Sequence, residues 1–332
     1  MENELNETKD IRFESRLDLS ELQESMNAVR QELKKVIVGQ DKIIDYLLVA
    51  MLANGHVLLE GVPGVAKTMA IKLLSRSVDV KFSRIQFTPD LMPSDILGTS
   101  VFDLKKTTFE FRQGPIFANL ILIDEVNRAP AKTQAALFEV MDERQITIDG
   151  KTYKMEEPFL VMATQNPIEQ EGTYRLPEAQ LDRFMFKVVI NYPTLEDEFE
   201  IIRREHEAVD GDKTVGVKAV LSGAKIAEYK NVVRRIIVEQ NIIEYIARIV
   251  KNTRENPFLY LGASPRASLA ILNASKGFAA LRGRDFVTPE DIKDSVVVVL
   301  QHRIIVSPEK EMEGLKADDI VKQIIESVEV PR

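Results

Sequence analysis

The sequence predicts an α/β domain with a parallel sheet of five strands and helices on both faces, followed by an all-α domain. Short apolar runs alternate with helical stretches over the first 193 residues, which is typical of a parallel sheet with both faces covered. A glycine-rich turn follows the first apolar run and leads into a helical stretch. From Leu195 onward apolar residues recur at helical spacing, and no strand pattern is convincing.

The first two elements are predicted helices. Ser20 to Lys35 carries apolar residues at helical spacing, with Ser20 as the expected N-cap. A second helix is expected from Gln40 to Asn54. Five strands of the sheet are expected next, at His56–Glu60, Arg84–Thr88, Asn119–Asp124, Phe159–Thr164 and Phe186–Ile190. A helix over Met69–Val78 is expected directly after the glycine-rich turn.

Two hairpins interrupt the alternation of strands and helices. The expected strands are Val101–Leu104 with Thr108–Arg112, and Gln145–Asp149 with Tyr153–Glu156. The second pair would flank a two-residue turn of the Gly-x type at Gly150–Lys151. The helices predicted for the second domain are Glu196–Glu207, Val232–Glu255, Arg266–Leu281, Pro289–His302 and Ala317–Val328. We expect an N-terminal helical segment at 1–35, the α/β domain at 36–193 and the helical domain at 194–332.

Composition limits the class of protein. The chain has 332 residues, of which 45% are apolar, so two domains with ample core can form. It has no cysteine, which excludes disulfides and thiolate metal sites. His56, His206 and His302 show no ligand spacing and are interpreted as structural. The formal net charge of −8 gives no support for a basic face that binds nucleic acid, so a nucleic-acid partner is disfavoured.

The N-terminal segment gives no sign of export. Met1 to Ser15 is polar and mostly acidic, without the basic and apolar regions of a signal peptide. No apolar run approaches the 18 residues of a membrane span. We therefore expect a cytoplasmic protein that is not inserted in a membrane.

The glycine-rich turn is predicted to hold the phosphates of a nucleotide. It comprises Gly61, Val62, Pro63, Gly64, Val65, Ala66, Lys67 and Thr68. Backbone N–H groups of such a turn point at phosphate oxygens, and the following helix adds its positive N-terminus. Lys67 would reach the β- and γ-phosphates, and the Thr68 hydroxyl would bind Mg²⁺. Ala66 replaces the second glycine of the general pattern, which requires a negative φ at that residue.

A buried strand that ends in Asp124 and Glu125 is predicted to supply the chemistry. Carboxylates at the C-terminal ends of parallel strands face the phosphate loop. Asp124 would hold Mg²⁺ through a water molecule, and Glu125 would orient and polarise the attacking water as general base.

Two further polar residues each have two interpretations. Asn166, at the end of the next strand, would sense the γ-phosphate or the attacking water, whereas Asn166–Pro167 could equally form a simple turn. The first interpretation is favoured because this strand would lie beside the Asp124 strand. Arg183 is either a surface ion-pair partner or an arginine finger that acts on the nucleotide of a neighbouring subunit. The sequence alone does not separate these two roles.

Together these residues resemble the AAA+ ATPases and, within them, the MoxR family. The stretches that carry the resemblance are Gly61-Val-Pro-Gly-Val-Ala-Lys-Thr, Gln86-Phe-Thr-Pro-Asp-Leu-Met-Pro-Ser-Asp, Asp124-Glu-Val-Asn-Arg-Ala, Ala163-Thr-Gln-Asn-Pro and Gly262-Ala-Ser-Pro-Arg266-Ala. Ala66 is usual in that family. The resemblance covers the chain from about Lys35 to Arg303.

The resemblance implies further roles. Val38, Gly39 and Gln40 match the linker that lines the adenine pocket, and Arg266 matches the second sensor, acting in its own subunit or in the neighbouring one. The hairpins around Val101–Arg112 and Glu143–Pro158 match inserts that face the central pore of related rings. From its place on the neighbouring strand, Gln86 is expected to restrain Glu125 until a client binds.

The leading hypothesis is a Mg²⁺-dependent ATPase that binds ATP, assembles as a homo-oligomeric ring, expected to be a hexamer, and remodels a partner protein. The resemblance implies a separate client or adaptor, often with a von Willebrand factor A domain. A nucleic-acid motor is a second hypothesis, although the hairpin tip at Asp149–Lys154 is mixed in charge rather than basic. A chelatase-type motor subunit also fits the motifs. A nucleotide-controlled binding scaffold is a further hypothesis, but it would be expected to lack Glu125 or Arg183, and both are present.

Overall fold

The predicted five-stranded parallel sheet is confirmed. The computed structural model describes residues 17–61, 67–166, 173–174, 176–207 and 216–331. The sheet has the order β10-β1-β9-β6-β3, and every neighbouring pair is parallel. Its strands are β1 (His56–Gly61), β3 (Phe82–Gln86), β6 (Leu120–Asp124), β9 (Leu160–Gln165) and β10 (Phe184–Ile190). The strand of Asn166 therefore lies between the phosphate-loop strand and the Asp124 strand.

Both faces of the sheet are buried, as the nearly continuous apolar runs predict. Along β6, Leu120 and Leu122 face one apolar cluster, while Ile121 and Ile123 face another. The first cluster includes residues of α1 (Ser20–Lys34), α2 (Asp41–Ala53) and α3 (Lys67–Ser77) and continues into the C-terminal helices. The second includes residues of α4 (Pro93–Leu97) and α5 (Ala131–Glu143). The sheet is thus the middle layer of three.

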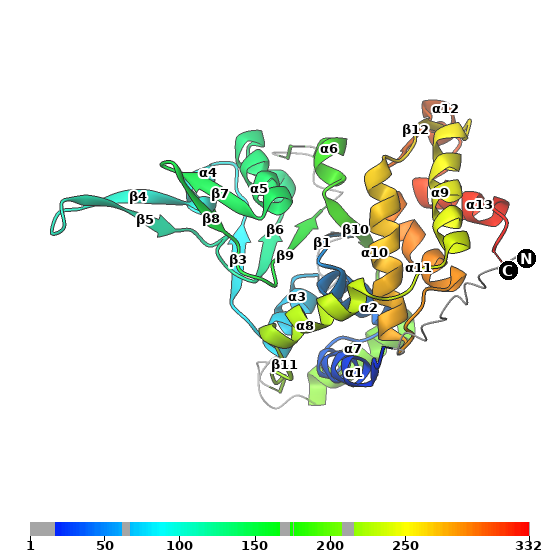
Figure 1. The fold of residues 1–332 in the computed structure, drawn as a ribbon, viewed down its shortest axis with the longest axis horizontal. Helices are drawn as coiled ribbons and strands as arrows, with labels where there is room; N and C mark the ends of the chain where they lie inside the picture. The colour runs from blue at the N-terminus through cyan, green and yellow to red at the C-terminus, as the bar shows by residue number, and fades with distance from the viewer. Residues whose placement is uncertain (1–16, 62–66, 167–172, 175, 208–215, 332) are drawn as a thin grey trace, which may run out of the picture.

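The C-terminal helices pack beside the sheet as a helical unit, termed the lid (Figure 1). They are α8 (Gly223–Arg234), α9 (Gln240–Glu255), α10 (Pro265–Leu281), α11 (Pro289–Leu300), α12 (Pro308–Met312) and α13 (Ala317–Ser327), and α6 (Glu178–Leu181) and α7 (Leu195–Glu207) precede them. Helix α2 is buried almost all round because it lies between the sheet and α10. No helix in the described part of the chain has the length and apolarity that a membrane crossing requires.

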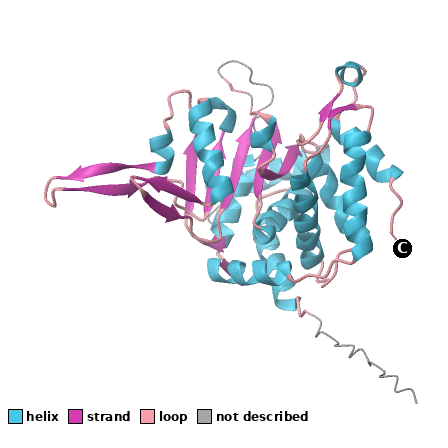
Figure 2. Ribbon diagram, turned by 45° about the horizontal axis from the view of Figure 1, so that its top comes forward, coloured by secondary structure: helices cyan, strands magenta, loops and turns pink. Residues whose placement is uncertain are grey.

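The two hairpins form at the predicted places. β4 (Gly98–Asp103) pairs antiparallel with β5 (Thr108–Gln113), and this hairpin extends away from the sheet on the side remote from the lid (Figures 1 and 2). β7 (Gln145–Ile148) pairs with β8 (Lys151–Lys154). The predicted turn at Gly150–Lys151 is wrong: the turn residues are Asp149 and Gly150, with φ values of 51° and 75°. Two consecutive positive φ values define a type I′ turn, which an Asp-Gly pair favours.

Two further predictions are corrected. Ser20 is the first residue of α1 rather than its N-cap, and its N–H is satisfied by the Asp18 carboxylate at 2.9 Å. The expected helix Val232–Glu255 is two helices, α8 and α9, and the start of α8 was not predicted. The break lies at Ile237, whose backbone forms hydrogen bonds with Asp285 and Val287 across the lid. This backbone pairing to a distant segment overrides the local helical pattern.

Three short strand pairings were also not predicted. β2 (Val78–Asp79) pairs with β11 (Leu221–Ser222), β12 (Leu259–Leu261) pairs with β13 (Ile305–Val306), and Ile237 forms an isolated bridge with Phe286. Each has three residues or fewer on a side, which is too short for a period-two pattern to be detected in sequence. The lid therefore remains a helical domain with small strand pairs at its margins.

His56 and His302 are buried in structural roles. The His56 Nδ1 atom accepts a hydrogen bond from the Val161 N–H at 3.0 Å, so its Nε2 donates to the Met141 carbonyl at 3.1 Å. His302 Nε2 lies 3.0 Å from the Phe184 carbonyl oxygen. Burial lowers the pKa of His56 to about 4 and holds the pKa of His302 well below its usual value. Both imidazoles are therefore neutral near pH 7.

We predict that His56 contributes to the loss of stability in acid. Its pKa is about 4 in the folded chain and 6.5 in the unfolded chain, so the unfolded state takes up the proton first as the pH falls. The free energy of unfolding should thus fall between pH 6.5 and pH 4. In urea unfolding, His56→Gln should remove about 2 kcal/mol of the decrease between pH 7 and pH 5. The control is His206→Gln at the exposed end of α7, and an equal decrease in both variants would contradict the prediction.

Candidate functional site

The C-terminal edge of the sheet gathers the predicted nucleotide residues. Gly61, Gln165 and Asp124 end three neighbouring parallel strands, so they lie at one edge. Lys67, the first residue of α3, donates from Nζ to the carbonyl oxygens of Gly61 and, at 3.3 Å, Gln165. Its ammonium group therefore spans the ends of two strands. The predicted phosphate-loop residues Val62, Pro63, Gly64, Val65 and Ala66 lie outside the described residues.

Thr68 and Asp124 are brought together at this edge. The Thr68 hydroxyl donates to Oδ1 of Asp124 at 3.1 Å, and the Thr164 hydroxyl donates to the same oxygen at 3.3 Å. Arg84 Nε donates to Oδ2 at 2.7 Å and balances the charge of this nearly buried carboxylate. A hydroxyl and a carboxylate in contact are oxygen ligands of the kind that Mg²⁺ prefers. The two predicted ligands, Thr68 and Asp124, therefore fit this ion chemically.

Glu125 has a left-handed backbone conformation. Its φ of 56° and ψ of 52° lie in the left-handed region, and its N–H donates to the Thr164 hydroxyl at 3.0 Å. Gln86 Nε2 donates to Oε2 of Glu125 at 2.9 Å, and Arg128 Nε lies 3.2 Å from the same oxygen. The expected contact between Gln86 and Glu125 is therefore present. It holds the carboxylate toward β3, the edge strand of the sheet.

Asn166 follows β9 directly and is 7% exposed. Its strand neighbours are β1 on one side and β6 on the other, so it lies between the strand ends that carry Gly61 and Asp124. This position is the one expected for a residue that contacts a γ-phosphate or its attacking water.

Val38, Gly39 and Gln40 line a cavity of about 350 Å³ beside the phosphate-loop strand. The other wall includes Ile190, which pairs with Gly61 in the sheet, and the segment that follows it. Gly39 has a φ of +70°, and a Cβ there would lie 2.2 Å from the Asp197 carboxylate, so glycine is required. The volume lies within the range of small-molecule pockets and suits an adenine ring.

Arg183 and Arg266 lie together elsewhere, on one carboxylate of α5. Arg183 Nη1 lies 2.7 Å from Oδ2 of Asp142, and Arg266 Nη2 lies 3.5 Å from the same oxygen. Arg183 Nη1 also donates to the Phe138 carbonyl at 2.8 Å. The surface ion pair considered for Arg183 thus exists within the chain, and it brings the two predicted arginines to one place.

This arginine pair lies at the N-terminal ends of the strands, whereas Lys67 lies at their C-terminal ends. Arg183 immediately precedes Phe184, and Phe184 pairs with His56 at the start of β1, whereas Gly61 ends β1. Gly61 lies five residue steps along the strand from His56, which corresponds to roughly 16 Å along the sheet. Arg183 therefore does not reach a nucleotide at the phosphate loop of its own chain.

Arg303, which the sequence did not single out, fixes the backbone around Arg183. Its guanidinium, just beyond the end of α11, is nearly buried and donates to the Asp182 carboxylate at 2.6 Å. It also donates to the carbonyl oxygens of Asp182, Phe184, Met185 and Val299. Burial lowers the pKa of Arg303, and the bond to Asp182 offsets part of this effect. Ser264, two residues before Arg266, donates to the other Asp182 oxygen at 3.0 Å.

Sequence reasoning missed several residues of these two clusters. Thr164 could have been found, because it is the last residue of a predicted strand beside Asp124. Arg84 and Asp142 gave no such signal, since each acts through a partner 40 or more residues away in sequence. Arg303 lay within a region of family resemblance but carried no motif of its own.

Two family models match the chain. Residues 56–186 match the ATPase family associated with various cellular activities, and residues 251–324 match the AAA lid domain. A crystal structure of a candidate ATPase from Cytophaga hutchinsonii is similar at a TM-score of 0.87 and 41% identity, covering 95% of this chain and 97% of that one. The sheet domain and the lid thus both have known counterparts.

Curated relatives extend over nearly the whole chain. YeaC of Bacillus subtilis, whose function is uncharacterised, is 44% identical over 301 residues, 91% of this chain and 93% of YeaC. Chaperone MoxR1 of Mycobacterium tuberculosis is 44% identical over 310 residues, 91% of this chain and 81% of MoxR1. Protein MoxR of Methylorubrum extorquens is 28% identical over 337 residues, 94% of this chain and 97% of that protein.

We predict that Arg303→Gln lowers the free energy of unfolding by about 3 kcal/mol, because it leaves the partly buried Asp182 carboxylate without its charged partner. Urea unfolding measures the change. Arg248→Gln on the exposed face of α9 is the control and should change it by less than about 0.5 kcal/mol. Equal stability of the two variants would mean that the Arg303 hydrogen bonds do not hold this edge together.

Proposed function

The chain belongs to the MoxR family of AAA+ ATPases, and from that premise we propose that it hydrolyses ATP with Mg²⁺ at a site shared by two copies of the chain. One observation carries the proposal. The residues that could bind phosphate and Mg²⁺ lie at the C-terminal ends of the strands. The two arginines that could contact a γ-phosphate lie at the N-terminal ends. A second copy is needed to bring them together.

At the phosphate-loop edge, each side chain has a role that its position supports. Lys67 would bind the β- and γ-phosphates, and Thr68 and Asp124 would hold Mg²⁺, Asp124 through a water molecule. The ion would offset charge on the phosphates as the γ-phosphoryl group departs. Glu125 would leave Gln86, orient the attacking water and accept its proton. Asn166 would contact the γ-phosphate.

The adenine ring would lie in the cavity beside Val38, Gly39 and Gln40. That cavity borders β10 next to Gly61, so a nucleotide there can extend its phosphates to the end of β1. The loop itself, from Gly61 through Val62, Pro63, Gly64, Val65 and Ala66 to Lys67 and Thr68, would wrap the phosphates with its backbone N–H groups.

From the opposite edge, Arg183 would act as the arginine finger on a neighbouring copy, and Arg266 would act beside it as the second sensor. Their shared contact with Asp142 holds both guanidinium groups in place before a phosphate is present. In an assembly they would exchange this carboxylate for phosphate oxygens. An arginine finger contributes roughly 10³–10⁵-fold to the rate in related enzymes.

An exposed apolar stripe supports assembly with a second copy. Leu195, Phe199 and Ile202 on α7 are 80%, 69% and 62% exposed and lie at helical spacing on one face. Tyr192, which lines the adenine cavity, is 71% exposed next to them. A subunit seated at this edge would cover apolar surface that is otherwise left in water.

Hydrolysis would drive the remodelling of a separate client or adaptor protein in the cytoplasm by a ring, expected to be a hexamer. The 44% identical relative from Mycobacterium tuberculosis is called a chaperone, which supports a protein client. The β4–β5 hairpin supports it too, because Phe102 and Phe109 pack edge to face with ring centroids 5.1 Å apart, and Leu104 is 85% exposed near its tip. A partner with a von Willebrand factor A domain is one that the family resemblance implies.

We predict that Glu125→Gln binds ATP as the wild type does but hydrolyses it at least about 10²-fold more slowly, because the amide cannot accept the proton of the attacking water. Binding is measured with a fluorescent ATP analogue and hydrolysis by phosphate release in Mg²⁺.

Glu139→Gln, on the exposed face of α5, is the matched control and should retain the wild-type rate. A Glu125→Gln protein that turns over at the wild-type rate would remove Glu125 from the catalytic role. Loss of both activities in the control would indicate a fault in folding rather than in chemistry.

A further inference from the structure

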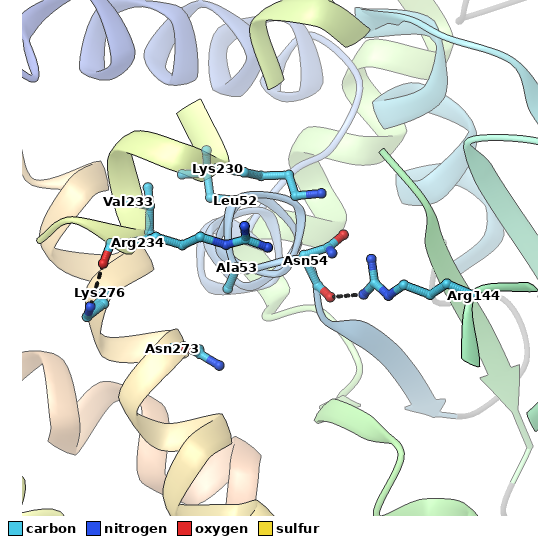
Figure 3. Close-up of a pocket in the computed structure, with 9 residues that line it drawn as sticks. All are labelled: Leu52, Ala53, Asn54, Arg144, Lys230, Val233, Arg234, Asn273 and Lys276. Atoms are coloured by element: carbon cyan, nitrogen blue, oxygen red, sulfur yellow. Dashed lines mark hydrogen bonds between the residues drawn. The ribbon is translucent and has the colours of Figure 1, made fainter. Parts of the chain in front are cut away.

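A second cavity lies between the sheet domain and the lid, away from the phosphate loop. It has a volume of about 280 Å³ and is lined by residues of α2, α8 and α10, together with Asn54 just after α2 and Arg144 just after α5 (Figure 3). Its lining residues are Leu52, Ala53, Asn54, Arg144, Lys230, Val233, Arg234, Asn273 and Lys276. Asn54 precedes β1, so the cavity lies near the N-terminal edge of the sheet, opposite Lys67.

The charges around this cavity are unbalanced. Four of its nine lining residues are cations, namely Arg144, Lys230, Arg234 and Lys276, and none is acidic. The acid in contact is Glu157, whose carboxylate accepts from the nearly buried Lys230 Nζ at 2.7 Å. One carboxylate against four cations leaves an excess of three positive charges.

The hydrogen bonds of these cations leave donors unused. Arg144 Nη2 donates to the Asn54 carbonyl at 2.7 Å, but its Nη1 is buried and has no hydrogen-bond partner among the residues that the structure describes. Lys276 donates to the Arg234 carbonyl at 2.7 Å. In Figure 3 the guanidinium groups of Arg144 and Arg234 project toward Asn54 from opposite sides of the cavity.

Burial makes this arrangement costly. It lowers the pKa of Arg144, Lys230 and Lys276, and for Lys230 the nearby arginines lower the pKa further. Like charges held together in a partly buried site are destabilising unless a counter-charge is present. An anion in the cavity would supply it and would satisfy the unused donors.

We propose that this cavity binds a compact multivalent phosphate anion, of the size of a pyrophosphate group. Guanidinium groups bind phosphate oxygens in pairs, and the lysines and the Asn54 and Asn273 amides can supply further donors. The volume lies just below the range of pockets that enclose whole organic ligands, so a phosphate pair fits better than an entire nucleotide. The site goes beyond the proposed ATPase activity and shares none of its residues.

Binding of inorganic pyrophosphate is the direct test. Isothermal titration is performed on the full chain with saturating ADP and Mg²⁺, so that the phosphate loop is already occupied. We expect one site per chain that is at least about tenfold weaker in Arg234→Gln, because one charge-assisted contact is lost. Arg234 makes no side-chain hydrogen bond that the described structure shows, so this variant should fold normally.

Asn273→Asp provides a second readout. It places a carboxylate among the cations, so it should abolish pyrophosphate binding and raise the melting temperature of the protein without added ligand. Lys251→Gln on the exposed face of α9 is the charge-matched control for Arg234→Gln and should bind as the wild type does. No binding by the wild type in the presence of ADP, or equal binding by all variants, would overturn the proposal.

Discussion

The parallel pairing of β1 with β10 is the constraint on which the functional geometry depends. It fixes Gly61 beside Ile190 and His56 beside Phe184, so Lys67 and Arg183 lie at opposite edges of one sheet. No side-chain movement spans the length of these strands. A phosphate at Lys67 and an arginine at position 183 can therefore meet only between two copies of the chain.

Hydrogen bonds hold the backbone around Arg183 and Arg266 in place, as they do around Lys67 and Asp124 at the other ends of the strands. Arg303 joins the end of α11 to the backbone on both sides of Arg183, and Ser264 joins the start of α10 to the same Asp182 carboxylate. Arg183 and Arg266 consequently share Asp142 although they are distant in sequence. A movement of the lid would shift Arg266 and the support of Arg183 together, which is a route by which hydrolysis and lid position can be coupled.

Sequence patterns predicted the sheet, both hairpins and most helices because these depend on local periodicity and on turn residues. They failed where distant pairing decides the conformation, as at Ile237. They also placed one turn a residue too late, since Asp149 rather than Lys151 forms it with Gly150. Motifs pointed to Lys67, Asp124 and Glu125, whose roles stay predictions, since their spacing reflects one chemistry. Asp142 and Arg303 were missed because their roles arise from packing between elements far apart in the chain.

Mixing two inactive variants tests the shared site most directly. Lys67→Ala removes the phosphate ligand and Arg183→Ala removes the finger, and each protein alone should hydrolyse ATP at background rate. A one-to-one mixture should recover activity, because about a quarter of randomly formed interfaces pair an intact loop with an intact finger. No recovery in a mixture shown by mass to co-assemble, or full activity of Arg183→Ala alone, would contradict the account.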